Sequence, residues 1–98
     1  MDTYGFKNYL RKATYMLRGK AAHYTENAVN SRVSKAVALE NDLGIDLDDY
    51  VTSDERFEGL LYRIRAAKIE DPAHTPKSNA ARHYYKYKNN GKEFGRIF

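Results

Sequence analysis

The chain lacks cysteine and tryptophan, contains only two prolines and has no long apolar run. The absence of cysteine excludes a disulfide framework, a thiolate zinc site and a cysteine nucleophile. No segment approaches the roughly 20 apolar residues that a membrane-spanning helix requires. Met1 is followed by Asp2 and by no apolar run of the kind found in signal peptides. We therefore expect a cytoplasmic protein that has no membrane partner.

Charge is distributed unevenly along the 98 residues, although the net charge is only +4. Residues 1–35 hold seven Lys/Arg and two acids, residues 36–71 hold four and ten, and residues 72–98 hold six and one. Charges of this kind usually do no more than solvate exposed helix faces. The alternative is a domain whose two basic segments meet on one side and bind phosphate. Both interpretations stand at this point.

Apolar residues recur at helical spacing in four segments that are joined by short links. The second segment is the clearest, because Thr25 is placed as an N-cap and Gly44 can take a positive φ at the end. The length of the chain suits one core. We predict a single all-α domain over 1–98, with helices at about 4–18, 25–43, 53–68 and 76–90 and a tail at 91–98.

The first predicted helix depends on one periodic series of apolar residues. These follow the i, i+3, i+4, i+7, i+10, i+11 spacing of a single helix face and are Phe6, Tyr9, Leu10, Ala13, Met16 and Leu17. Gly19 is the predicted stop. In the second helix, Val37 is assigned to the apolar stripe. In the third helix, Gly59 lowers the helix propensity, which we interpret as a sign of close packing against a neighbour.

Residues that could carry catalysis or hold a metal ion are isolated from one another. The three histidines show no HxxxH or HExxH relation. Asp46, Asp48 and Asp49 lack the further ligands of a calcium loop. The six glycines form no phosphate loop, and no serine has the context of a nucleophile elbow. We expect a protein that is not an enzyme and that uses no metal and no cofactor.

Four stretches of the sequence carry a resemblance to a known family. They are Phe6-Lys7-Asn8-Tyr9-Leu10, Tyr24-Thr25-Glu26-Asn27-Ala28-Val29 with Leu43-Gly44-Ile45, Thr52-Ser53-Asp54, and the run from Ser78 to Tyr87. In this order they resemble the N-terminal core-binding domain of phage integrases and other tyrosine recombinases. The resemblance implies a compact four-helix SAM-like orthogonal bundle of two helical hairpins, which forms half of a clamp around duplex DNA. The family's catalytic His-x-x-Arg is absent, so no tyrosine is assigned as a nucleophile.

The resulting hypothesis is a non-catalytic domain that contacts double-stranded DNA through the basic faces of helices 1, 2 and 4. Cations of these helices would contact phosphates, and amides together with one arginine would read bases. The proposed phosphate contacts are Lys7, Arg11, Lys12, Arg18, Lys20, Arg32, Lys35, Lys77, Arg82, Lys86 and Lys88. The proposed base-reading residues are Asn27, Asn30, Asn79 and Arg82.

A second hypothesis is a protein-interaction module, for instance a small regulator of a phage or mobile element. Its docking face would be the acidic segment 46–58. Its anchor would be the aromatic tail, since large apolar residues often carry most of the energy of an interface. The anchor residues are Phe94, Ile97 and Phe98.

Overall fold

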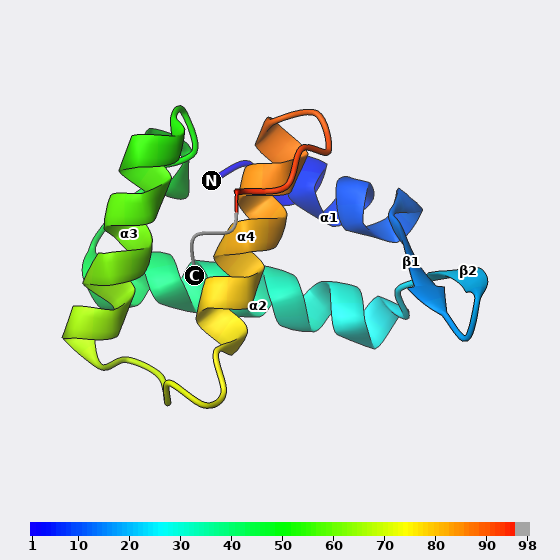
Figure 1. The fold of residues 1–98 in the computed structure, drawn as a ribbon, viewed down its shortest axis with the longest axis horizontal. Coiled ribbons are helices and arrows are strands. Elements are labelled where there is room, and N and C mark those ends of the chain that lie inside the picture. Colours follow the sequence, from blue (N-terminus) through cyan, green and yellow to red (C-terminus); the bar gives the residue numbers. More distant parts are fainter. Residues whose placement is uncertain (96–98) are drawn as a thin grey trace.

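The computed structural model describes residues 1–95, in which four α-helices surround a common core and a small antiparallel sheet projects from one end (Figure 1). Two strands joined by a tight turn form this sheet, and a short 3-10 turn, η1, links the second helix to the third. The elements are α1 (Thr3–Lys12), β1 (Thr14–Leu17), β2 (Lys20–His23), α2 (Glu26–Leu43), η1 (Leu47–Asp49), α3 (Asp54–Ala67) and α4 (Pro76–Lys88).

The α2 helix is the central element, and its predicted ends are confirmed. The Thr25 side chain accepts a hydrogen bond from the Ala28 amide at 3.1 Å, and Gly44 has a φ of 64°. The helix packs against both α1 and α4 through a stripe of small and medium apolar side chains. Val37 is 37% exposed and does not belong to this stripe, whereas Leu39 is fully buried in it. The assignment of Val37 to the apolar stripe was therefore wrong, although Val29, Val33 and Ala36 of the same stripe are buried.

The first helix ends at Lys12, six residues before its predicted boundary. Ala13 already has extended backbone, and β1 then pairs with β2 in an antiparallel hairpin that places Leu17 opposite Lys20. Arg18 and Gly19 both have positive φ, 53° and 80°, as a two-residue type I′ turn requires. The prediction of a purely all-α domain is thus corrected to a mainly helical fold with a two-stranded sheet.

The hairpin replaces the predicted end of the helix because of interactions that periodicity does not report. Thr14 and Tyr15 are β-branched and aromatic residues, which favour strands. Tyr15 stacks on Tyr24 with ring centroids 4.9 Å apart, a contact that joins the hairpin to the start of α2. Met16 and Leu17 were predicted to face the core, yet they are 69% and 52% exposed.

The remaining helices begin and end within two residues of their predicted limits. Ser53 caps α3 by accepting from the Arg56 amide at 3.2 Å. Thr75 stands at the predicted N-cap of α4 but makes no capping hydrogen bond with its side chain. The Glu70 carboxylate takes that role, since it accepts from the Lys77 amide at 2.7 Å and from Ser78. A residue outside the helix therefore anchors its first turn.

Aromatic side chains in the core join α1 to α4, and they join α3 to α4 and to the tail. Phe6 of α1 meets Tyr84 of α4 edge to face at a centroid distance of 5.1 Å. Phe57 of α3 lies 4.8 Å from Tyr85 and 5.0 Å from Phe94. Phe94 is 9% exposed, so this part of the tail packs back onto the helices. The other two predicted anchor residues, Ile97 and Phe98, lie outside the described residues.

Two glycines in helices should respond oppositely to alanine. A Cβ at Gly5 would overlap the Tyr87 hydroxyl and the Asp2 carboxylate, whereas a Cβ at Gly59 meets no atom of the described chain within 4 Å. The close packing predicted at Gly59 was therefore wrong. We expect Gly5→Ala to destabilise the fold by about 1–3 kcal/mol because it forces apart the Asp2–Tyr87 pair. Gly59→Ala should stabilise it by about 0.5–1 kcal/mol through helix propensity.

Urea unfolding of the two alanine variants provides the measurement, and each variant controls for the other because the chemical change is the same. Equal and stabilising effects at both positions would contradict the packing around Gly5.

Candidate nucleic-acid interface

One end of the molecule is formed by the C-terminal half of α1, the β1–β2 hairpin and the first half of α2 (Figure 1). We call this surface, residues 7–35, the basic end. No acid occurs between Asp2 and Glu26 in the sequence. Five side chains of this surface have no ion-pair or hydrogen-bond partner among residues 1–95. They are Lys7, Lys12, Arg18, Lys20 and Lys35.

Two contacts fix the base of the hairpin to the helices on either side. Arg11 of α1 binds Glu26 of α2, with Nη2 2.6 Å from Oε1 and Nε 3.1 Å from the same oxygen. This hydrogen bonding raises the pKa of Arg11 and lowers the pKa of Glu26, so both remain charged. Arg32 lies 4.3 Å from the centroid of the Tyr24 ring, which itself stacks on Tyr15. Arg11 and Arg32 therefore hold the hairpin in place and already have partners.

Three predicted phosphate contacts of α4 lie beside carboxylates of the same chain. Lys77 Nζ is 2.5 Å from Asp42, Lys86 Nζ is 3.5 Å from Glu93, and Lys88 Nζ is 3.8 Å from Asp48. The structure thus separates the predicted cations into two groups. Those of α1, the hairpin and α2 are gathered at the basic end and mostly unpaired, whereas the three lysines of α4 lie beside acids of the same chain.

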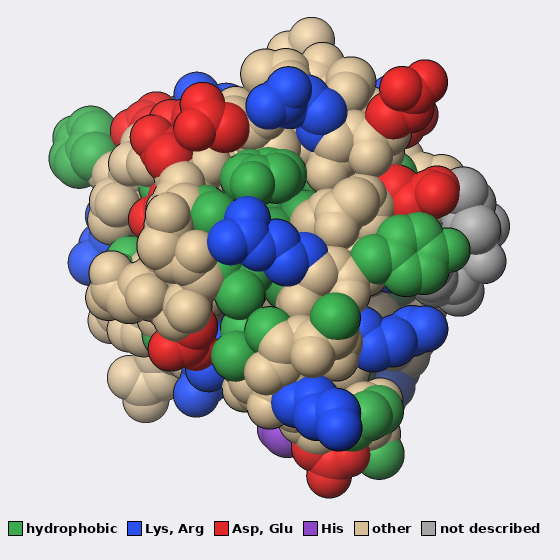
Figure 2. Space-filling model, turned by 90° about the vertical axis from the view of Figure 1, so that its left-hand side faces the viewer, with side chains coloured by type: hydrophobic (Ala, Val, Ile, Leu, Met, Phe, Trp, Pro, Cys, Tyr) green, Lys and Arg blue, Asp and Glu red, His purple; other side chains and the backbone are tan. Residues whose placement is uncertain are grey.

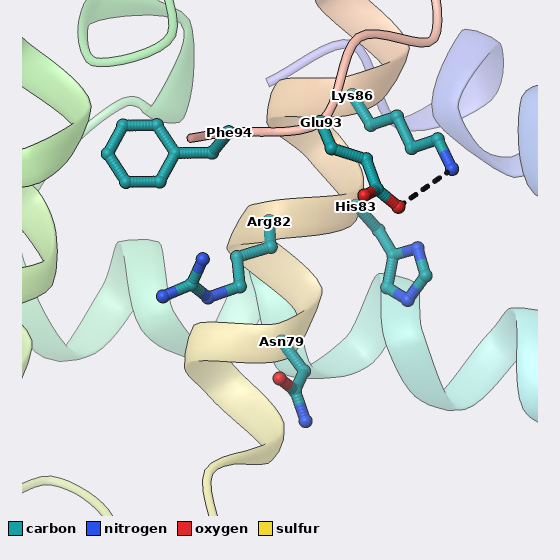
Figure 3. Close-up of a pocket in the computed structure, with 6 residues that line it drawn as sticks. All are labelled: Asn79, Arg82, His83, Lys86, Glu93 and Phe94. Carbon is teal, nitrogen blue, oxygen red and sulfur yellow. Dashed lines mark hydrogen bonds and ion pairs between the residues drawn. The ribbon is translucent and has the colours of Figure 1, made fainter. Parts of the chain in front are cut away.

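The predicted base-reading residues are divided in the same way. Asn27 and Asn30 are exposed on the first half of α2 and belong to the basic end. Asn79 and Arg82 stand on α4, beside a hollow of about 270 Å³ that the tail covers in part (Figure 3). Partial burial lowers the pKa of Arg82, whose guanidinium carbon lies 5.8 Å from the Phe94 ring.

His83 borders the same hollow and is held in its neutral form. Burial lowers its pKa to about 4, and the positive charges of Arg32 on α2 and Lys86 on α4 act in the same direction. Glu93 opposes them, but Figure 3 shows its carboxylate joined to Lys86. The Tyr24 ring meets the imidazole edge to face at 5.8 Å.

Acid should therefore unfold the protein partly through His83. An unfolded chain binds a proton at this histidine below its ordinary pKa of 6.5, whereas the folded chain resists protonation down to about pH 4. Stability should fall as the pH drops through this window, by up to about 1.4 kcal/mol per pH unit from this group. His83→Gln should flatten that part of the stability profile, and His74→Gln, at an exposed position, should leave it unchanged. Equal profiles for both variants in urea titrations would contradict the burial of His83.

The acidic segment 46–58 supplies partners to the fold itself. Asp46 accepts a hydrogen bond from the amino group of Met1 at 2.7 Å. Asp48 accepts one from the Tyr84 hydroxyl and Asp54 one from the Tyr85 hydroxyl. Burial raises the pKa of Tyr84, and the bond to Asp54 raises that of Tyr85 to about 12. Three of the acids predicted to form a docking face thus already accept hydrogen bonds from groups of the same chain.

A second hollow, of about 520 Å³, lies between α3 and α4 at the end opposite the hairpin. Leu61 and Ile64 contribute apolar lining, and Lys68 and Arg82 contribute cations. Figure 2 views this end and shows hydrophobic side chains at the centre, Lys and Arg side chains among them and acidic groups toward the margins. This mixed surface differs from the basic end, where unpaired cations predominate.

No family model, curated protein or solved structure matches the chain. The resemblance to recombinase core-binding domains therefore depends on the sequence stretches alone. No helix of the described part is long and apolar enough to cross a membrane. Within the same residues, no group of three or more His, Asp or Glu side chains is placed to hold a metal ion.

The hairpin is the part of the candidate interface that sequence reasoning missed. Arg18 and Lys20 were predicted as contacts, but at the end of a helix and not on a projecting turn. The available signal was Gly19 after a short run that begins with Thr14 and Tyr15, two residues that favour strands. Arg-Gly is not one of the common hairpin turn pairs, so this signal was weak.

Proposed function

We propose that this protein is a non-catalytic DNA-binding domain that acts in the cytoplasm and binds duplex DNA through its basic end. The observation that carries the proposal is the group of five unpaired cations on a surface whose single acid, Glu26, is bound by Arg11. Unpaired surface cations on one side are the electrostatic footprint of a phosphate-binding protein. The contacts we propose are Lys7, Lys12, Arg18, Lys20 and Lys35.

The shape of this end also suits a duplex. A two-stranded ribbon is narrow enough to enter a DNA groove, and α1 and α2 flank the ribbon with further cations. Asn27 and Asn30 lie on the same half of α2 and offer amide groups to phosphates or base edges. Acids collect instead around η1 and the start of α3, at the other end of the fold. The molecule would therefore approach DNA in one orientation.

The proposal extends to the fold family. We propose that the four helices form a variant of the SAM-like bundle of two helical hairpins, in which a β-hairpin joins the first two helices. The predicted docking of a protein through segment 46–58 or the tail remains the alternative. It has less geometric support, because Asp48 and Asp54 already accept hydrogen bonds from tyrosines of the chain and Phe94 packs against the helices.

Fluorescence anisotropy of a labelled random-sequence duplex, titrated with the protein at several salt concentrations, tests this function. Five phosphate contacts should give a plot of log K against log salt with a slope of about −4 to −5. Absence of binding at low salt, or binding that does not respond to salt, would refute the proposal.

A further inference from the structure

The β1–β2 hairpin carries two apolar side chains next to its turn that are more than half exposed. Met16 and Leu17 are 69% and 52% exposed and point to opposite faces, because neighbouring residues of a strand alternate. Leu17 belongs to the last strand pair before the turn, opposite Lys20. A two-stranded hairpin is marginally stable in water, and apolar side chains exposed at its tip add little to its stability.

The turn itself is strained at Arg18. Its φ of 53° lies in the left-handed region, where a residue with a Cβ is disfavoured. Type I′ turns ordinarily place Asn, Asp or Gly at this position. An arginine here places a guanidinium at the turn of the hairpin, with Leu17 before it and Lys20 after Gly19. Strain of this kind at a projecting residue points to a function for its side chain.

The positive charges around the tip of the hairpin favour a polyanion over a second copy of the chain as its partner. Neither outer edge of the hairpin pairs with another strand of residues 1–95, so a second copy could add strands to it. Such a pairing would bring two sets of Lys12, Arg18 and Lys20 together without an intervening acid, which like-charge repulsion disfavours. A polyanion neutralises these charges, and a DNA groove also offers apolar base faces to Leu17.

We propose that the hairpin is a DNA-bending arm that enters the minor groove, with Arg18 between the two backbones and Leu17 as a wedge between base pairs. This inference rests on the proposed DNA-binding function. Cations held in the minor groove meet its strong negative potential, and apolar wedges unstack a base step and kink the duplex. Lys12 and Lys20 would contact the phosphates on either side of the inserted tip.

Energy transfer between dyes at the two ends of a short duplex measures the bend. The wild-type protein should increase transfer on binding. Leu17→Ala should return transfer at saturation to the level of the free duplex and weaken binding about tenfold, while the salt slope stays unchanged because no cation is removed. Leu17→Met, which keeps an apolar side chain, should restore the bend. Circular dichroism should be unchanged in both variants, since Leu17 lies outside the core.

Duplexes of inosine–cytosine pairs distinguish binding in the minor groove from binding in the major groove. Their minor groove presents the same groups as that of A·T, whereas their major groove is like that of G·C. Duplexes of A·T and I·C should bind with affinities within about twofold, and G·C should bind about tenfold more weakly, since its amino group blocks the minor-groove floor. An I·C duplex that behaves like G·C would place the arm in the major groove and overturn the inference.

The failures of the two proposals can be told apart. Salt-dependent binding without a bend, or a bend that survives Leu17→Ala, overturns the arm and leaves DNA binding intact. No binding to any duplex overturns both. A dimer in sedimentation velocity that Leu17→Ala dissociates would assign the tip to a second copy, which also overturns the arm.

Discussion

Reversal of Arg18 and Lys20 to glutamate is expected to weaken duplex binding about a hundredfold at about 0.1 M salt, which corresponds to roughly 2.7 kcal/mol. Each substitution removes a phosphate contact and adds a repulsive charge at the tip of the hairpin. Both side chains are exposed and have no partner in the described chain, so stability should change by less than about 0.5 kcal/mol. Anisotropy titrations of the double variant against wild type measure the effect.

Lys92→Glu provides the matched control for this charge reversal. Lys92 is an exposed lysine whose side chain also lacks a described partner, but it lies in the tail, away from the basic end. Its reversal changes the net charge of the protein in the same way as the reversal of Lys20 alone. We expect Lys92→Glu to lower affinity less than threefold and Lys20→Glu about tenfold. Equal losses would mean that net charge, and not the basic end, governs binding.

Replacement of Phe6 by alanine is expected to destabilise the fold by about 3–5 kcal/mol. The ring is fully buried, meets Tyr84 edge to face and stacks against Tyr87 at 6.1 Å. Its loss leaves a cavity where α1 meets α4, and small domains have only about 5–15 kcal/mol of stability in total. The expected result is a large fall in the urea midpoint with little change in slope.

Tyr4→Ala is the control for this cavity, since Tyr4 stands two residues earlier in α1 and is 79% exposed. It removes an aromatic ring of similar size from the same helix and should change stability by less than about 0.5 kcal/mol. A small loss for Phe6→Ala, close to that of Tyr4→Ala, would contradict the docking of α1 on α4.

Local signals were sufficient for most of the helical architecture. Thr25 with Gly44, and Ser53 with the acids behind it, mark helix ends by chemistry that operates within four residues. Such local signals do not depend on how the rest of the chain packs. The predicted limits of α2, α3 and α4 were therefore close to those observed.

The end of α1 could not be predicted from apolar spacing, because Met16 and Leu17 continue the helical series and are nevertheless exposed. A periodic pattern indicates a helix only if the residues are buried together, and burial depends on distant elements. Here the Tyr15–Tyr24 stack and the turn at Arg18 and Gly19 favour the hairpin.

The predicted interface was limited by the same lack of distant information. The sequence identifies the cations, but their availability depends on partners far along the chain. Lys77 and Asp42 are 35 residues apart, and the distance between their charged groups is 2.5 Å. The sequence likewise does not reveal that Asp48 accepts a hydrogen bond from the Tyr84 hydroxyl. Among the described residues, most cations of residues 7–35 have no ion-pair partner, and these are the ones to which we assign the proposed role.

The contact between α1 and α4 also governs the order in which the chain can fold during synthesis. Phe6 leaves the ribosome before Tyr84, its nearest aromatic neighbour, which is translated 78 residues later. Until then α1 and α2 can pair only with each other, and the apolar surfaces that await α4 stay accessible. A nascent chain that stalls before α4 should thus be a target for chaperones and proteases. Rapid pairing of α1 with α2 would limit that exposure.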